Sequence, residues 1–312
     1  MAKKQKERLD VYQRVTDEII QAIEAGADKW EMPWHSPETA FRYPVNIESG
    51  KQYRGVNVLG LWASSYLQGF QEPVWGTFKQ WGDKGLFVRK GEKATIGVFW
   101  KQLQPNDQAD QPSTDDAEGQ NGPRLVARAF PLFNAQQIEG YEPSPLPAPH
   151  FERVQRAEEF FAALGADIRH GGGKAYFRPE ADYIQMPPFE AFFDPIAYYS
   201  TLAHEATHWS GHKSRLDRDL KGRFGSESYA AEELIAELGA AFIAADLELA
   251  PEPRPENAAY IQSWLKVLRE DNRAIFTASS HAQRATDFMH SLQPSADLHP
   301  EPALLRSPFP AP

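Results

Sequence analysis

The segment His204-Glu205-Ala206-Thr207-His208 constrains the fold of this 312-residue chain more than any other feature. Residues four apart lie on one face of a helix, so two histidines at this spacing predict a helix on which both imidazoles reach one metal ion. Glu205 directly follows the first histidine and is placed to take a proton from water at the ion. This HExxH pattern predicts a zinc hydrolase.

The residues around the motif favour a helix from about 195 to 210. Asp194 is a suitable N-cap, and Pro195 fits the first helical position, where no backbone N–H is needed. Gly211 is a suitable end for the helix. Apolar residues recur between these ends at helical spacing, at Ile196, Tyr199, Leu202 and Ala203.

A catalytic zinc ion needs a third protein ligand and keeps one position for water. The longer pattern HExxHxxGxxH would supply a third histidine, but Ser214 occupies its last position. His212 would need a local turn to reach the ion. A better source of the ligand is a second amphipathic helix, predicted over residues 229–243.

Three glutamates on that second helix are candidates. Glu233 and Glu237 are four apart and share a face, whereas Glu232 is expected to point elsewhere. We expect Glu233 to be the third ligand and Glu237 to orient His204 or His208 from outside the ligand set. The reverse assignment, with Glu237 as the ligand, stays open. Tyr229 and His212 are the candidates for stabilising the oxyanion.

The composition narrows the chemistry further. The chain contains no cysteine, which excludes thiolate zinc sites and a cysteine nucleophile. The expected cofactor is therefore Zn²⁺ held by imidazole and carboxylate, with another divalent transition metal as the alternative. No apolar run is long enough to span a membrane, and the first residues lack an apolar signal core. We expect a cytoplasmic protein that does not contact membranes.

Proline-rich and acidic stretches suggest how the chain is divided. We expect an α+β protein of two domains, in which the second is mostly helical with a small sheet and each half folds on its own core. The expected parts are a domain over 1–141 with an acidic loop inserted at 104–123, a linker over 142–150, a domain over 151–292 and a proline-rich tail over 293–312.

Periodicity predicts further elements in both halves. Helical spacing is present over 11–25, 57–66, 151–164, 255–272 and 274–292. Strand-like segments over 94–101 and 125–133 flank the acidic loop, so they are expected to form a hairpin. A second hairpin is expected from residues 175–177 and 183–186, just before the HExxH helix.

Charge and aromatic residues are concentrated in the first third of the chain. Residues 1–101 contain 15 Lys and Arg against 12 Asp and Glu, whereas residues 151–312 contain 16 against 24. Six of the eight tryptophans also lie before residue 101. Aromatic faces among basic residues are typical of proteins that bind single strands without sequence preference. Composition alone fits equally well a tryptophan-rich core with a solvated basic rim.

Several motifs resemble the ArdC family of antirestriction proteins, whose N-terminal domain also heads TraC-type plasmid primases. In the first half they are WEMPW (30–34), YRGVNVLGLW (53–62), WGTFKQW (75–81), VRKGEK (88–93) and FNAQQIEG (133–140). In the second half they are YYSTLAHEATHWSGH (198–212), SRL (214–216), YAAEELIAE (229–237) and YIQSWL (260–265). The resemblance covers nearly the whole chain and implies a DNA-binding domain followed by a zincin-like metallopeptidase.

The resemblance also implies a plasmid-borne protein that binds single-stranded DNA and protects incoming DNA during conjugation. A host restriction enzyme subunit would be a protein substrate. The candidate DNA-binding residues are Trp34, Tyr53, Arg54, Asn57, Trp75, Lys79, Trp81, Arg89, Lys90 and Lys93. The rival hypothesis is a non-enzymatic protein that coats single-stranded DNA and whose zincin domain is idle. A metal-dependent nuclease is disfavoured, since such sites present clustered carboxylates to magnesium.

Overall fold

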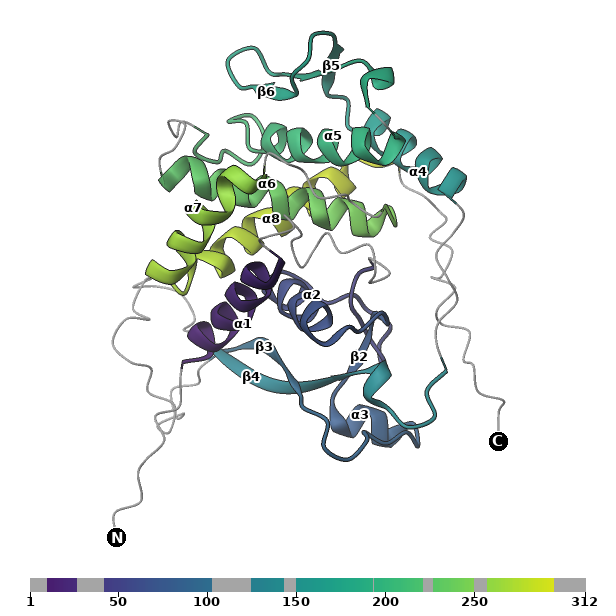
Figure 1. Cartoon of the computed structure of the whole chain (residues 1–312). Helices are drawn as coiled ribbons and strands as arrows, with labels where there is room; N and C mark the ends of the chain where they lie inside the picture. Colours follow the sequence, from purple (N-terminus) through teal and green to yellow (C-terminus); the bar gives the residue numbers. More distant parts are fainter. Residues whose placement is uncertain are drawn as a thin grey trace.

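The computed structural model describes residues 10–26, 42–102, 125–142, 150–192, 194–220, 227–249 and 257–294. Within these residues the protein has an α+β fold of two domains, stacked in layers (Figure 1). A four-stranded sheet lies at one end, and helices separate it from a three-stranded sheet at the other. None of the described helices is both long enough and apolar enough to cross a membrane.

The amino-terminal domain packs two long helices and one short helix on one sheet. Its helices are α1 (Val11–Gly26), α2 (Val56–Gln68) and the short α3 (Phe78–Asp83). Its strands are β1 (Val45–Asn46), β2 (Val74–Gly76), β3 (Thr95–Gln102) and β4 (Leu125–Asn134), in the order β1-β2-β4-β3, and a 3₁₀ turn η2 (Ala135–Gln137) follows. The strands β3 and β4 are antiparallel neighbours, as predicted for the segments that flank the acidic loop.

The carboxy-terminal domain is mainly helical. Its helices are α4 (His150–Ala163), α5 (Pro195–Ser210), α6 (Glu227–Asp246), α7 (Asn257–Glu270) and α8 (Ala274–Ser291). The strands β5 (Asp167–His170), β6 (Tyr176–Arg178) and β7 (Tyr183–Met186) form a sheet in the order β5-β7-β6, and the 3₁₀ turn η3 (Phe189–Ala191) leads toward α5. The expected hairpin of β6 and β7 is confirmed.

The hydrophobic core is continuous between the two domains, which corrects the expectation of a separate core for each half. Buried residues of α1 and α2 belong to the same cluster as those of α5, α6 and α8. At the centre of the boundary, the rings of Tyr43 and Trp62 lie 6.0 and 5.8 Å from the ring of Phe242 on α6. Folding therefore buries apolar surface of both domains in one shared core.

Candidate metal centre

The ends of helix α5 are set by the residues that the sequence indicated. The Asp194 carboxylate accepts a hydrogen bond from the backbone N–H of Ala197 at 2.9 Å, and Pro195 occupies the first turn. At the other end, the Gly211 N–H donates to the carbonyl oxygen of His208 at 2.9 Å. The predicted caps are confirmed, and they fix which faces of α5 the two histidines occupy.

Helix α6 lies against α5 at a point where only glycine fits. A Cβ at Gly239 would lie 2.5 Å from Cγ2 and 2.6 Å from Oγ1 of Thr207, the fully buried residue that precedes His208. Thr207 is held in turn, because its hydroxyl donates to the carbonyl oxygen of Ala203 at 2.8 Å. The missing side chain at residue 239 allows the close approach that brings the carboxylates of α6 to the histidines of α5.

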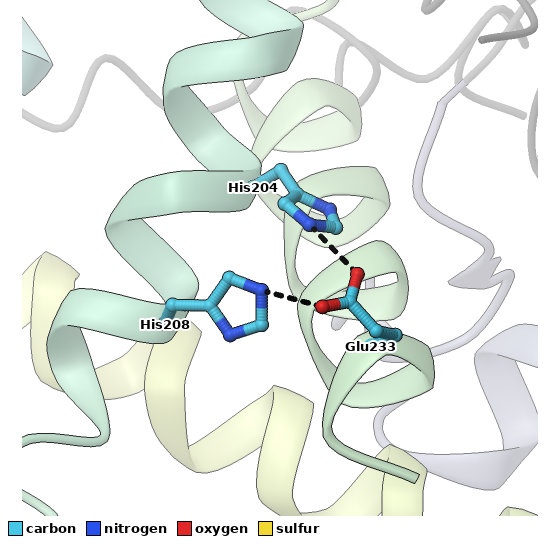
Figure 2. Close-up of side chains that lie close together, drawn as sticks. All are labelled: His204, His208 and Glu233. Carbon is cyan, nitrogen blue, oxygen red and sulfur yellow. Dashed lines mark ion pairs between the residues drawn. The ribbon is translucent and has the colours of Figure 1, made fainter. Parts of the chain in front are cut away.

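Two histidines and one glutamate converge between these helices (Figure 2). The Nε2 atom of His204 lies 3.4 Å from Oε2 of Glu233, and Nε2 of His208 lies 3.6 Å from Oε1 of the same carboxylate. One ligand atom from each of the three residues lies within 4.8 Å of the others. Zinc bonds of ~2.0–2.1 Å in a tetrahedron place ligand atoms about 3.3 Å apart, so this donor set fits a divalent ion after small side-chain shifts.

The Nδ1 atoms of the two histidines face two other carboxylates. Nδ1 of His204 lies 3.7 Å from Oε2 of Glu237, and Nδ1 of His208 lies 3.1 Å from Oε1 of Glu232. The expectation that Glu232 points elsewhere is therefore wrong. Residues 232 and 233 are 100° apart on the helix. The two ring nitrogens of His208 are far enough apart for Nδ1 to meet Glu232 while Nε2 meets Glu233. The geometry favours Glu233 over Glu237 as the ligand, because Glu237 meets the opposite nitrogen of His204.

Arg218 is a residue of this site that the sequence did not indicate. Its guanidinium makes two hydrogen bonds to the Glu232 carboxylate, at 3.1 and 2.8 Å. The only sequence signal was a basic residue in a short segment after the HExxH helix, and that segment folds back onto α5 by contacts that spacing cannot predict.

The charges of these groups reinforce one another. Burial alone would raise the pKa of Glu233, but hydrogen bonding to His204 and the charges of His208 and His204 lower that pKa to about 2. Burial likewise opposes ionisation of Glu232, yet hydrogen bonds from His208 and Arg218 hold the pKa of this carboxyl below its ordinary value. Both glutamates are therefore carboxylates at neutral pH, the state that a cation requires.

The proposed base and the oxyanion candidates lie in different surroundings. Glu205 is buried on α5, and its carboxylate has no hydrogen bond or ion pair with the residues that the structure describes. Burial, the Tyr260 hydroxyl at 3.4 Å and the charge of Glu233 raise the pKa of Tyr229, which keeps its proton. His212 instead contacts Ser214, with Nδ1 2.7 Å from Oγ. Tyr229 is thus the candidate beside the ligand set.

Three of the expected DNA-binding side chains are structural. Trp75 is 1% exposed and Trp81 is fully buried, with its Nε1–H donating to the carbonyl oxygen of Phe133 at 3.1 Å. Asn57 is bound at both ends of its amide to the backbone of Val98, at 2.8 and 2.7 Å. The prediction that these two indoles stack on bases is wrong, because tertiary packing places them in the core.

The other expected DNA-binding residues are more accessible. Tyr53 is half-buried, and its hydroxyl accepts a hydrogen bond from Asn46. Exposed basic residues pair with acids at Arg54–Asp287, Lys79–Asp83 and Arg89–Glu92. Lys90 and Lys93 are exposed, and Trp34 lies outside the described residues.

We expect Gly239→Ala to disturb the centre by forcing α6 away from α5. Overpacking of this kind costs about 1–3 kcal/mol in the free energy of unfolding, so the melting temperature should fall. Gly82→Ala is the matched control, because a Cβ there meets nothing within 4 Å. Thermal unfolding of both variants measures the difference, and equal melting temperatures for Gly239→Ala and the unchanged protein would contradict the close approach.

Comparisons with known families cover both domains. Residues 9–133 match the N-terminal domain of the anti-restriction factor ArdC. Residues 155–281 match a zincin-like metallopeptidase family, MPTase-PolyVal. The order of the two matches agrees with the order of the two domains in the structure.

Individual relatives extend the similarity to almost the whole chain. The uncharacterized protein y4eC of Sinorhizobium fredii (strain NBRC 101917 / NGR234) is 51% identical over 288 residues, which is 92% of this chain and 94% of that protein. The DNA primase TraC of Escherichia coli is 38% identical over 289 residues. That region covers 89% of this chain but only 27% of the primase.

Two crystal structures of the antirestriction protein ArdC from plasmid R388 share the fold, with a TM-score of 0.74 for each. The metal-free structure is 40% identical and covers 91% of this chain and 98% of ArdC. The Mn(II)-bound structure is 38% identical, with coverage of 92% and 100%. Because identity at this level extends over the full length of ArdC, this chain belongs to the ArdC family of antirestriction proteins and carries a zincin-like metallopeptidase domain.

Proposed function

We propose that the carboxy-terminal domain is a metal-dependent peptidase, with a divalent ion held by His204, His208 and Glu233. The observation that carries the proposal is the convergence of both Nε2 atoms on one carboxylate, at 3.4 and 3.6 Å. When bound, such an ion polarises a carbonyl oxygen and makes water more acidic. Zinc is our first expectation, and manganese is a specific alternative because a structure of R388 ArdC contains Mn(II).

The remaining steps fall to side chains of this chain. Glu205 would accept a proton from the attacking water and pass it to the leaving amine, since it is adjacent to the first ligand and lacks another partner in the described part of the site. Tyr229 keeps its proton and lies beside Glu233, so it is placed to donate a hydrogen bond to the developing oxyanion. Strand β6 is an edge strand next to α5 and is suited to pair with an extended substrate backbone.

Metal binding gives the first test of this site. Purified protein should bind about one ion per chain, and His204→Ala or His208→Ala should abolish that binding. Chelation should lower the melting temperature, because an ion that binds only the folded state stabilises it. Metal analysis joined to thermal unfolding measures both effects. A melting temperature that chelator leaves unchanged would argue against the assignment.

We also propose that the amino-terminal domain binds single-stranded DNA on the outer face of the β3–β4 hairpin. In this hairpin Phe99 lies opposite Arg128, while Phe130 is a diagonal neighbour whose ring is 5.9 Å from that of Phe99. Phe99 is 47% exposed, and Lys101 is exposed on the same face. Bases stack on such rings while cations meet the phosphates. This face replaces Trp75 and Trp81, which are buried.

Phe99→Ala should weaken the binding of an oligothymidylate. Loss of one stacking partner costs about 1–3 kcal/mol, or about 5- to 150-fold in Kd. Arg128→Gln should instead lower the slope of log Kd against log salt by about one. Phe189→Ala is the control, because this ring is similarly exposed, at 41%, but lies in the other domain. Fluorescence anisotropy at several salt concentrations measures both quantities, and unchanged binding by Phe99→Ala would exclude this face.

Together these activities suggest a cytoplasmic protein that protects incoming plasmid DNA during conjugation. DNA binding would bring the peptidase to a host restriction enzyme on the same DNA, and a subunit of that enzyme would be the substrate. The rival function is protection by coating the DNA alone. Incubation of the protein with purified restriction subunits, with and without single-stranded DNA, tests the proposal, because only a peptidase generates new fragments in a mass spectrum.

A further inference from the structure

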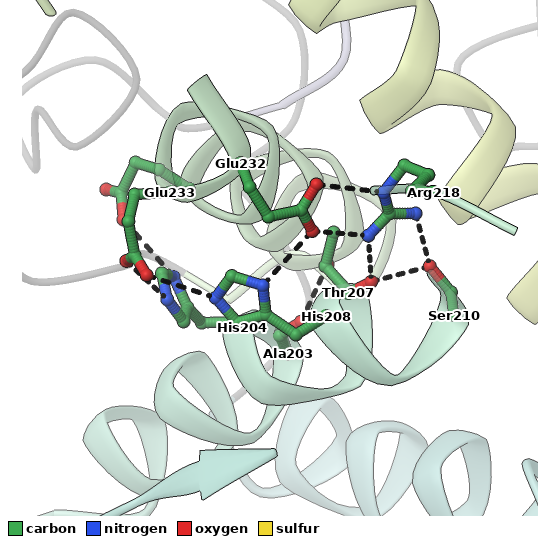
Figure 3. A network of polar contacts seen from close by, with 9 residues as sticks. Ala203, His204, Thr207, His208, Ser210, Arg218, Glu232 and Glu233 are labelled. Atoms are coloured by element: carbon green, nitrogen blue, oxygen red, sulfur yellow. Dashed lines mark hydrogen bonds and ion pairs between the residues drawn. The ribbon is translucent and has the colours of Figure 1, made fainter. Parts of the chain in front are cut away.

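Arg218 is almost fully buried, although it carries a permanent charge. Its side chain is 4% exposed and comes from the segment that follows α5. Besides Glu232, the guanidinium donates to the carbonyl oxygen of Thr207 at 2.6 Å and to Oγ of Ser210 at 2.9 Å (Figure 3). All three of these partners lie on α5 or α6. Burying such a charge is costly unless its hydrogen bonds are well satisfied, as they are here.

The partner carboxylate connects Arg218 to a proposed metal ligand. Oε1 of Glu232 accepts from Arg218 at 2.8 Å and lies 3.1 Å from Nδ1 of His208. The opposite nitrogen of His208, Nε2, faces Glu233 at 3.6 Å. A carboxylate that accepts the Nδ1 proton leaves the Nε2 lone pair free to bind an ion and fixes the plane of the ring.

The Nδ1 atoms of the two candidate ligand histidines lie at different distances from their nearest glutamate on α6. Glu237 lies 3.7 Å from Nδ1 of His204, which is longer than a hydrogen bond. Glu232 is within hydrogen-bond distance of His208 and is itself fixed by two bonds from one guanidinium. Fork-shaped pairing of this kind restrains the direction of a carboxylate as well as its position.

We propose that Arg218 is a positioning residue for the metal ligand His208 and acts through Glu232. This inference rests on the proposed metal centre but concerns a residue outside its ligands. The alternative is a staple that only attaches the segment after α5 to the two helices. A staple would contribute to folding, whereas a positioning residue must also change the affinity for the ion.

Gly211 provides an independent way to disturb the same contact. A Cβ at this position would lie 2.8 Å from Cζ and Nη2 of Arg218, so the guanidinium would have to move. The backbone of Gly211 is in the ordinary right-handed helical region, with φ −77° and ψ −6°, and alanine adopts it without strain. Gly211→Ala therefore shifts the arginine while every charged group of the network is kept.

The test is the affinity of the full-length protein for Zn²⁺, measured by competition with a chromogenic chelator. Arg218→Gln should raise the Kd for Zn²⁺ about 10- to 100-fold, the range found when partners of metal ligands are removed. Gly211→Ala should raise it in the same direction. Arg215→Gln is the matched control and should leave it unchanged. Arg215 is also an arginine of this segment with little exposure, 11% for its side chain, and it pairs with the carboxylate of Asp182. Asp182 is not a partner of His204 or His208.

Variants at residue 232 test whether the effect passes through Glu232. Glu232→Ala should weaken Zn²⁺ binding, and Arg218→Gln should then add nothing to the loss. Glu232→Gln keeps an acceptor for the His208 Nδ1 proton and should lose less affinity than Glu232→Ala.

The results distinguish an error in the role of Arg218 from an error in the metal site. If Arg218→Gln and Arg215→Gln bind Zn²⁺ as tightly as the unchanged protein while Arg218→Gln melts at a lower temperature, then Arg218 is only a staple. Additive losses of affinity from Arg218→Gln and Glu232→Ala would also overturn the proposed route. If the unchanged protein and His208→Ala both fail to bind Zn²⁺ or Mn²⁺, the assignment of the metal site is wrong. The role of Arg218 is then wrong as well.

Discussion

Glu205→Gln is expected to reduce peptide-bond hydrolysis by about 10²- to 10⁴-fold, the usual contribution of a general base. Glutamine has nearly the same size and shape as glutamate, and Glu205 is not among the three residues that converge at the candidate metal centre. Metal content and melting temperature should therefore stay as in the unchanged protein. The rate of fragment formation from restriction subunits, measured at matched metal occupancy, gives the ratio.

The same variant distinguishes the peptidase from a protein that only coats DNA. Glu205 belongs to the carboxy-terminal domain, so single-strand binding should be unchanged by the substitution. Loss of protection of incoming DNA in Glu205→Gln would link antirestriction to hydrolysis. Full protection by this variant would instead favour the coating function, with an idle zincin domain.

The local parts of the site could be predicted from sequence. The cap Asp194, the first-turn proline Pro195 and the four-residue spacing of His204 and His208 are properties of a single helix, and such properties depend on neighbours in the chain. The candidate Glu233 followed from the need for a third ligand and from the amphipathic pattern around it. For these residues the structure has the geometry that the sequence indicated.

The other contacts of the site depend on how two helices and a loop pack. The role of Glu232 could not be read from helical spacing, since a carboxylate 100° away from Glu233 reaches His208 only at the observed approach of α6 to α5. The approach depends on Gly239, and the contact of Arg218 depends on the path of the segment after α5. Neither feature leaves a periodic signal.

Short strands and buried aromatics were missed for a similar reason. The strand β5 pairs in parallel with β7, and β1 pairs in parallel with β2, and both pairings join segments that are not adjacent hairpins. Amino-acid composition is the same whether Trp75 and Trp81 face solvent or the core. Only the packing of the sheet against α2 and α3 decides between them.

The continuous core has a direct consequence for the amino-terminal half taken alone. Tyr43 and Trp62 are each 6% exposed, and both pack on Phe242, while Tyr12 lies 4.7 Å from Phe276 on α8. Polar contacts cross the same boundary, including the Thr16 hydroxyl, which donates to the carbonyl oxygen of Asn272 at 2.8 Å. A fragment that ends before α4 would expose its own side of this boundary, namely Tyr12, Thr16, Tyr43 and Trp62.

Residues 1–142 expressed alone are therefore expected to lack a cooperative thermal transition. Exposure of a large apolar side chain costs about 1.5–3 kcal/mol. Three such aromatics cost a large share of the roughly 5–15 kcal/mol by which a domain is stable. Circular dichroism and binding of a hydrophobic dye measure this loss. The control is coexpression with residues 143–312, which should restore a cooperative transition in a complex of the two halves. A fragment that melts cooperatively near the temperature of the full chain, and binds single strands equally well, would show instead that the amino-terminal core is sufficient.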